Sequence, residues 1–177
     1  MENVFIKSSE SSNFSWDSLG NIKEGRGSLG EEMPVLVYRL MQYTMRDVLA
    51  MDLGREKAND YLYKSGRLAG TEFTRNVLDL TADFNSFVAN LQKVLAELKI
   101  GILRIESVDQ TSGEIVMTVA EDLDCSGLPI TGENVCNYDE GFITGILELY
   151  TGKHYSVREI DCWASGDRVC RFQCMVV

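Results

Sequence analysis

Apolar residues recur every three or four positions through the first half of the chain, which is the period of one helix face. The first run predicts a helix over residues 31–52. A second run follows Gly54 and continues to about residue 77, and a third predicts a helix over residues 83–98. The sequence therefore predicts three helices in succession.

Near residue 100 the apolar period falls to two, which is typical of strands with one buried face. The pattern predicts four strands, paired around turns at residues 109–113 and 164–167, over residues 100–108, 114–121, 153–162 and 168–176. Between the two pairs, Asn137 and the acidic residues after it are suited to begin a helix over residues 138–151.

The order of these elements is helices first and then hairpins, with one helix between the hairpins. That order predicts an α+β fold, with the helices packed on one face of an antiparallel sheet. A chain of 177 residues suits one such domain. Residues 1–30 are rich in serine and glycine and are expected to form an arm, with one short strand at residues 4–7. We assign residues 31–177 to the domain.

Gly66 and Gly70 lie four residues apart on one face of the second predicted helix. Together they cost about 2 kcal/mol in helix propensity relative to alanine. We expect a close approach of another helix backbone to compensate, and contact with a ligand is the alternative.

The charge of the chain excludes one class of partner. There are 27 acidic residues against 17 lysines and arginines, which gives a formal net charge of −10. A nucleic-acid-binding surface needs clustered basic residues, so we expect no direct binding of nucleic acid.

The N-terminus lacks a basic segment followed by an apolar one, and no run approaches 18 apolar residues. We therefore expect a cytoplasmic protein without a membrane partner.

Five cysteines without a secretion signal argue against a disulfide framework and favour thiols that can bind metal. Glu159 falls on the predicted buried face of its strand, and a hairpin turn near Gly166 sets Cys162 opposite Cys170. Cys136 precedes the helix over residues 138–151, whose dipole favours a thiolate. Three thiolates and one carboxylate can hold zinc tetrahedrally, and four protein ligands leave no open position, so the role would be structural.

Two features count against this metal site. Glu159 and Cys162 are three residues apart, so the strand must bend or bulge between them for both to reach one ion. In addition, buried cysteines are common without a metal, and Glu159 could pair with an arginine instead. We expect Cys174 to be a small buried apolar residue, while Cys125, in a loop with glycine and proline, stays open.

No convincing catalytic apparatus is visible. His154 is the only histidine, so any Ser-His-Asp or Cys-His arrangement must use it, and we expect it to be exposed. There is no P-loop, no GxGxxG after a strand and no HExxH. The sequence favours a protein that is not an enzyme.

Two segments in the last third of the chain carry a specific pattern. Residues 136–145 read CNYDEGFITG, and residues 157–172 read VREIDCWASGDRVCRF. This pattern resembles the vinyl-4-reductase domain family, which is also described as hydrocarbon-binding. The helix with Gly66 and Gly70 resembles the family's central segment, so the resemblance covers about residues 33–177.

The resemblance implies a fold similar to that of TRAPP vesicle-tethering subunits, and a homodimer. Family members include the sensor domains of phenol- and toluene-responsive activators, in which three cysteines and a glutamate hold zinc. That motif matches Cys136, Glu159, Cys162 and Cys170 here. The histidine and tryptophan that bind phenol in the sensors have no counterpart between Glu31 and Val135, so phenol itself is not supported. The activators' ATPase and DNA-binding domains are also missing, so any regulation would act through another protein.

These observations predict a zinc-stabilised module, dimeric and sensory or regulatory, that binds a small hydrophobic or aromatic ligand between helices and sheet. Candidate lining residues, which could equally be ordinary core, are Phe73, Val77, Phe84, Phe87, Met117 and Trp163. One alternative is a reductase or accessory factor acting on a tetrapyrrole vinyl group, although no dinucleotide fingerprint is present. The other is a dimeric scaffold.

Overall fold

The computed structural model describes residues 12–177, and the chain separates into two units between Glu32 and Met33. The described part of the first unit contains two single-turn helices, η1 (Trp16–Leu19) and α1 (Ile22–Gly25). The side chain of Asn21 accepts a hydrogen bond from the backbone N–H of Glu24 and so caps α1. The sequence predicted no helix here, because one turn is too short to show an apolar period. The strand predicted at residues 4–7 lies outside the described residues.

The second unit contains four helices close to the predicted ranges. They are α2 (Val35–Leu53), α3 (Arg55–Val77), α4 (Phe84–Glu97) and α5 (Asn137–Thr151). The predicted start of the first helix at residue 31 is wrong. Pro34 is the N-cap of α2 in an extended conformation, and proline disfavours helical geometry at the residue before it.

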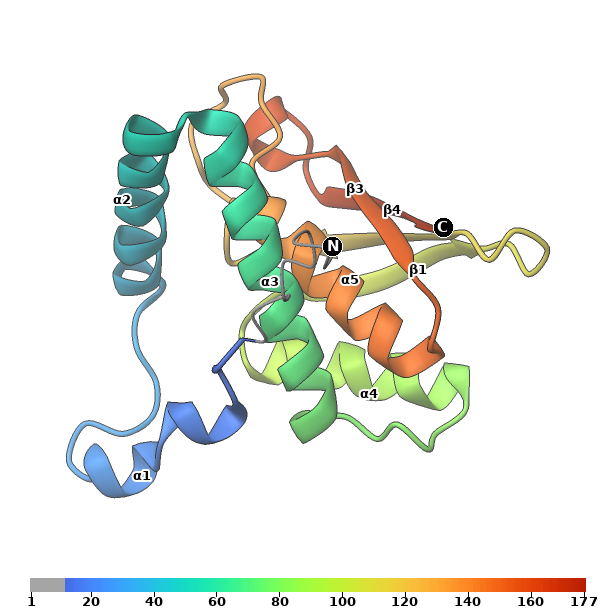
Figure 1. Ribbon diagram of the computed structural model, residues 1–177, viewed down its shortest axis with the longest axis horizontal. Helices are drawn as coiled ribbons and strands as arrows, with labels where there is room; N and C mark the ends of the chain where they lie inside the picture. The colour runs from blue at the N-terminus through green and yellow to red at the C-terminus, as the bar shows by residue number, and fades with distance from the viewer. Residues whose placement is uncertain (1–11) are drawn as a thin grey trace, which may run out of the picture. The chain divides into compact units, whose positions relative to one another are not determined.

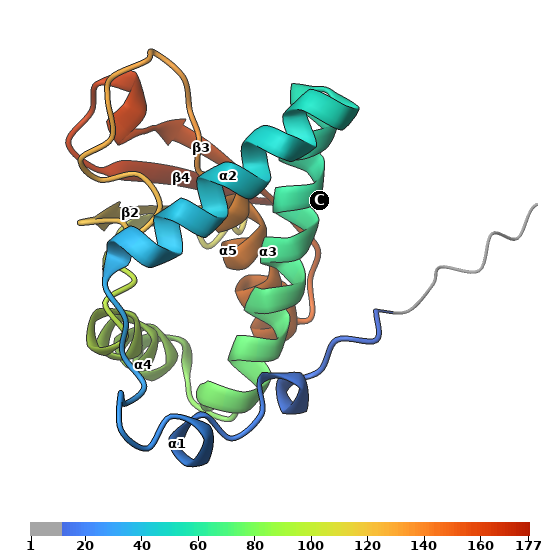
Figure 2. The ribbon, with the colours of Figure 1, turned by 90° about the vertical axis from the view of Figure 1, so that its left-hand side faces the viewer.

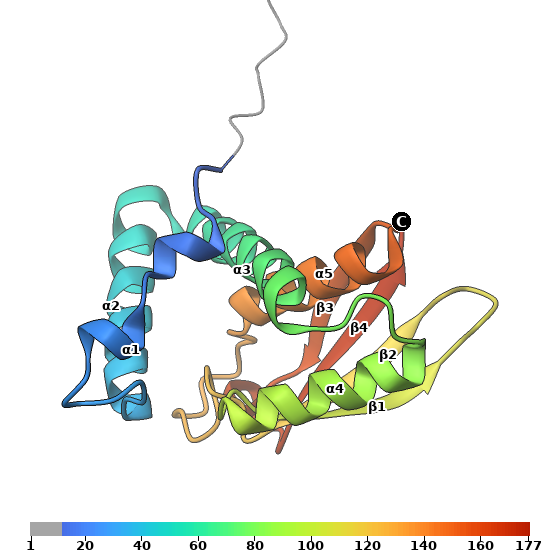
Figure 3. The same ribbon diagram turned by 90° about the horizontal axis from the view of Figure 1, so that it is seen from below.

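Four antiparallel strands form one sheet in the order β1-β2-β4-β3, from β1 (Ile102–Val108), β2 (Ile115–Ala120), β3 (Tyr155–Asp161) and β4 (Cys170–Val176). Figure 1 shows the sheet behind α5, and Figure 3 shows α4 running along β1. Between β3 and β4 lies a 3-10 turn, η2 (Trp163–Ser165), followed by Gly166 in a left-handed conformation. The predicted α+β class is therefore confirmed.

The helices α3 and α5 pack closely along their length, as Figure 1 shows. A Cβ atom on Gly66 would collide with the carbonyl oxygen of Tyr138, and one on Gly70 with that of Phe142. Gly141 and Gly145 of α5 meet the backbone of α3 in the same way. The close helix crossing predicted for Gly66 and Gly70 is therefore confirmed, and it needs glycines on both helices.

The helix α2 contacts the rest of its unit through polar residues. The hydroxyl of Tyr38 donates to Asp124 Oδ1 (2.8 Å), and Gln42 Nε2 donates to Asp124 Oδ2 (2.5 Å). Figure 2 shows α2 and α3 diverging from the point where they join. The apolar stripe of α2 is instead exposed, with Leu40 64% and Met51 75% accessible. No helix among residues 12–177 is long and apolar enough to cross a membrane.

Candidate metal centre

Four fully buried cysteines from four separate segments meet at one end of the sheet. Cys125 lies in the loop after β2, Cys136 caps α5, Cys162 follows β3 and Cys170 begins β4. Their sulfur atoms all lie within 4.8 Å of one another. The structure thus gathers the three predicted cysteines and adds Cys125, which the sequence left open.

Two of three sulfur–sulfur distances match a tetrahedral thiolate site, and the third is shorter. Cys136 Sγ is 3.8 Å from Cys162 Sγ and 3.8 Å from Cys170 Sγ, while Cys125 Sγ and Cys170 Sγ are 3.0 Å apart. Four sulfurs placed about 2.3 Å from a zinc ion would be about 3.8 Å from each other. Four soft thiolates are also a donor set that zinc accepts. The residues present therefore fit a zinc ion.

Local hydrogen bonds fix the backbone around two of the cysteines. Asp122 Oδ1 accepts from the backbone N–H groups of Asp124 and Cys125, both at 2.9 Å, so the loop is folded around this carboxylate. The hydroxyl of Ser165 accepts from the N–H of Cys162 (3.1 Å) and donates to its carbonyl (2.8 Å). These hydrogen bonds fix the backbone positions from which the Cys125 and Cys162 thiols project.

Glu159 contacts the centre through the backbone of a cysteine. Its Oε2 accepts a hydrogen bond from the N–H of Cys136 (3.1 Å), whereas its buried Oε1 has no partner among the described residues. The strand register shifts between Glu159 and Asp161, which is the bend that the sequence required between Glu159 and Cys162. The four-thiol group does not include Glu159. Its role as a ligand stays a prediction.

The surroundings of the thiols are rich in buried acids. Burial raises the pKa of Glu159 to about 8 and that of Asp122 to about 7, and it raises the pKa of Asp139 well above its usual value. Hydrogen bonding among the thiols, first of all with Cys125, lowers the pKa of Cys162 and raises that of Cys136. A bound cation would favour the ionised form of all four thiols.

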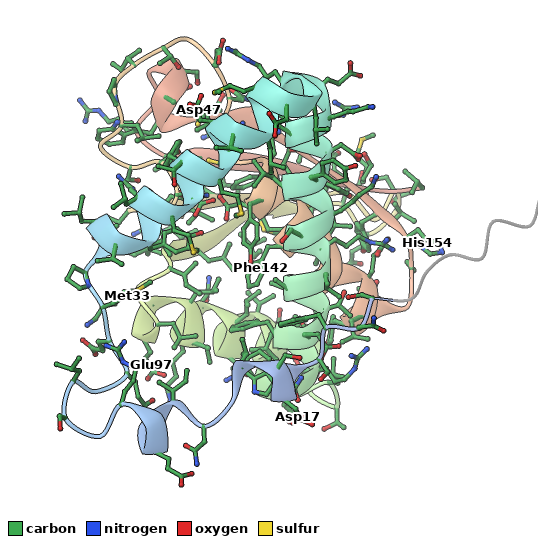
Figure 4. The ribbon with its side chains drawn as sticks, turned by 60° about the vertical axis from the view of Figure 1, so that its left-hand side comes forward. Asp17, Met33, Asp47, Glu97, Phe142 and His154 are labelled. Atoms are coloured by element: carbon green, nitrogen blue, oxygen red, sulfur yellow. The ribbon has the colours of Figure 1, made fainter. Side chains whose placement is uncertain are left out.

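The predicted ligand-lining residues are not gathered in one cavity. Phe73 and Met117 are buried in the core, and so is Phe87, whose ring stacks on Tyr150 at 3.7 Å. The ring of Phe73 contacts that of Phe142, a half-buried residue of α5 that is labelled in Figure 4. Val77 is half-buried.

The two remaining lining residues belong to different cavities. Phe84 lines one of about 420 Å³, and Trp163 lines another of about 500 Å³. The predicted common pocket stays a prediction.

Two further residues lie where the sequence placed them. Cys174 is fully buried outside the four-thiol group, and burial raises its pKa to about 12. His154 lies at the edge of the unit, with 80% of its side chain exposed and Nδ1 3.2 Å from Glu148 Oε1 (Figure 4).

Comparisons with known proteins agree with the resemblance seen in the sequence. Residues 115–175, which include Cys125, Cys136, Cys162 and Cys170, match the sequence model of the V4R domain. The uncharacterized protein MJ1642 of Methanocaldococcus jannaschii is 27% identical over 150 residues, covering 84% of this chain and 81% of that protein. The resemblance to the vinyl-4-reductase family is thereby confirmed.

Solved structures show the same fold at low sequence identity. A vinyl-4-reductase family protein from M. jannaschii superposes with a TM-score of 0.61 at 15% identity, covering 94% of this chain and 99% of that one. The phenol-responsive sensory domain of the transcription activator PoxR, solved with phenol, gives 0.58 at 15% identity, with 83% and 76% covered.

A trafficking protein particle complex subunit 3 from Naegleria fowleri, covalently bound to palmitic acid, gives a TM-score of 0.60 at 15% identity, with 81% of this chain and 97% of that one covered. The predicted similarity to TRAPP subunits is therefore confirmed for the fold.

Proposed function

We propose that this protein is a zinc-stabilised module that binds a small hydrophobic or aromatic molecule and acts as a sensory or regulatory partner of another protein. The observation that carries the proposal is the group of four buried cysteines, whose sulfurs lie within 4.8 Å of one another. The fold shared with the PoxR sensory domain supports the ligand-binding part. Five free thiols suit a reducing compartment, so we place the protein in the cytoplasm.

The zinc would be held by Cys125, Cys136, Cys162 and Cys170, and it would neutralise thiolates that burial otherwise disfavours. Four protein ligands close the coordination sphere, so the role of the ion is structural. It ties the loop after β2 and the first turn of α5 to the β3–β4 hairpin. Binding free energy at such a site is also folding free energy.

The stripe along α2 supports a homodimer. Exposed apolar side chains, 49–76% accessible, follow one face of the helix: Leu36, Val37, Leu40, Met41, Met45, Val48 and Met51. A contiguous exposed apolar face of this kind marks a protein interaction surface. Thr44 lies midway along the stripe, and its hydroxyl donates to Leu40 O, so its methyl group is free for contact. Two antiparallel copies could cross there, with Leu40 of each facing Val48 of the other.

The same dimer surface supports the second candidate function, a scaffold that only assembles partners. A reductase or accessory factor acting on a tetrapyrrole vinyl group is the third candidate. The three candidates differ in whether a ligand stabilises the protein and in whether the protein converts the ligand to a product.

One experiment separates the three candidates. The protein is incubated with naphthalene derivatives or with a vinyl porphyrin, with and without reduced nicotinamide, and both thermal stability and product are followed. A ligand-dependent rise in Tm without product is the result we expect. Reduced product that depends on the protein would overturn the proposal in favour of an enzyme. No stabilisation by any ligand, together with a copurifying partner chain, would favour the scaffold.

A further inference from the structure

A cavity of about 500 Å³ lies at the N-terminal end of α2, within the size range of small-molecule sites. Its walls come from the start of α2, the turn before β1, the loop after β2 and the β3–β4 connection. Residues that matter to its chemistry are Arg39, Lys99, Glu121, Leu123, Trp163 and Arg168. The cavity is distinct from the one that Phe84 lines.

Neither of the two arginines that line this cavity forms an ion pair within residues 12–177, although the charge of Arg39 acts on the nearby carboxylate of Asp124. Arg39 donates from Nε and Nη2 to the carbonyl oxygens of Leu123, Asp122 and Ser126, which are neutral acceptors. The exposed side chain of Arg168 forms no ion pair with any residue from 12 to 177. The chain as a whole has a net charge of −10, so two guanidinium groups without an ion pair at one cavity are unusual in it.

The acids at the same cavity offset this charge only in part. Asp122 is buried, and its Oδ1 already accepts hydrogen bonds from two backbone N–H groups of its own loop. Glu121 is the exposed acid of the lining.

The apolar part of the wall is a fixed aromatic ring. Trp163 is half-buried, and its indole Nε1 donates to the carbonyl of Leu128 (3.1 Å), which holds the ring in place. Leu123 is half-buried in the same wall. A flat apolar molecule can stack on an indole ring without first ordering it.

The backbone at this cavity is also unusual. Lys99 (φ 60°) and Glu121 (φ 51°) are the two non-glycine residues between positions 12 and 177 that have positive φ. Both line this cavity. Left-handed conformations of ordinary residues concentrate at ligand clamps and other functional sites.

We propose that this cavity binds a small aromatic carboxylate, with its ring against Trp163 and its carboxylate at the guanidinium groups of Arg39 and Arg168. The paired hydrogen bonds that a guanidinium group makes to a carboxylate would come from Arg168. Arg39, whose Nε and Nη2 already donate to carbonyl oxygens, would add its charge and its Nη1 group. The inference rests on the proposed ligand-binding function and names its ligand class. The site is lined by residues of α2 and of the loop that carries Cys125.

The test uses the full chain in the Trp16→Phe background, so that tryptophan fluorescence reports Trp163 alone. Binding of 1-naphthoate is compared with that of 1-naphthamide, which has the same ring and no charge, and inorganic phosphate serves as the anion without a ring. Arg168→Gln removes one guanidinium group. Arg104→Gln is the matched control, because Arg104 is an exposed arginine that lines the cavity of Phe84 instead.

We expect 1-naphthoate to quench Trp163 and to bind at least about tenfold more tightly than the amide. Arg168→Gln should abolish that preference, while Arg104→Gln should leave it unchanged. Equal binding of acid and amide would overturn this inference and leave the proposed function standing. Loss of the preference in Arg104→Gln alone would place the ligand in the other cavity. Absence of binding by either aromatic probe would count against the inference and the proposed function together.

Discussion

The carboxylate of Glu159 accepts a hydrogen bond from the backbone N–H of Cys136, with Oε2 and N separated by 3.1 Å. This contact ties β3 to the first turn of α5 and fixes the backbone from which the Cys136 thiol projects. A glutamate that matches a ligand position of the family motif therefore positions a cysteine in this structure. In the proposed site, Cys125 takes the place of the fourth ligand, because its sulfur lies within 4.8 Å of the other three.

The assignment of the fourth ligand predicts a clear difference between two variants. Cys125→Ser should reduce bound zinc strongly, because it removes one of four thiolates. Glu159→Gln should retain zinc, because the amide oxygen of glutamine can still accept from Cys136. Metal content is measured by elemental analysis of the purified proteins. The reverse result, with zinc lost only in Glu159→Gln, would restore the ligand set predicted from sequence.

The buried carboxylate of Asp122 predicts a pH dependence of stability. Its pKa in the folded protein is raised to about 7, above that of the unfolded chain, so the folded state binds more protons between these values. Stability contributed by this group is therefore lost as pH rises from about 4 to 7. Four thiolates around one Zn²⁺ would carry a net charge of −2 and would raise this pKa further.

Asp122→Asn keeps the acceptor for the N–H groups of Asp124 and Cys125 without the charge. We expect its Tm to match that of the wild type near pH 5 and to exceed it at pH 8. Thermal melts across this range test the prediction, and a variant that is less stable at pH 8 would contradict it.

The glycine contacts between α3 and α5 predict that a single methyl group is destabilising. Gly66→Ala should lower the free energy of unfolding by about 2–3 kcal/mol, because its Cβ meets the backbone of α5 rather than a movable side chain. Gly25→Ala is the control, since a Cβ there meets nothing within 4 Å. Chemical denaturation compares the two, and equal stability would exclude the close crossing.

The exposed stripe of α2 predicts that one charge disrupts the dimer. Leu40→Glu should convert a dimer into a monomer, as measured by analytical ultracentrifugation. Gln110→Glu adds the same charge in the exposed turn between β1 and β2 and should leave the dimer intact. A wild-type protein that is monomeric at all concentrations would show that two copies do not meet on this face.

The sequence predicted the elements well because their apolar periods are long and regular. It also predicted the approach at Gly66 and Gly70 and the bend after Glu159, since both follow from spacing alone. The position of Cys125 was not predictable, because its loop has no period and is shaped by Asp122 through local hydrogen bonds. The signal that could have indicated it is the Asp122-x-x-Cys125 spacing, which suits an Asx turn.

Two other features depended on the tertiary structure. The sequence pattern of α2 does not show which face of the helix packs against the rest of the unit. In the structure that face is the one with Tyr38 and Gln42, which contact Asp124. The six predicted lining residues share apolar character, but helix packing places several of them in the core. Position in the fold, rather than residue type, decides which of them meet a cavity.

Native mass spectrometry of protein purified without added metal tests the central claim most directly, with Cys162→Ser and Cys174→Ser beside the wild type. We predict one zinc ion per chain in the wild type and in Cys174→Ser, whose thiol lies outside the four-thiol group. Cys162→Ser should lose the ion and melt at a markedly lower temperature, because metal binding is coupled to folding. Wild-type protein without stoichiometric metal, and with both variants melting as it does, would contradict the account.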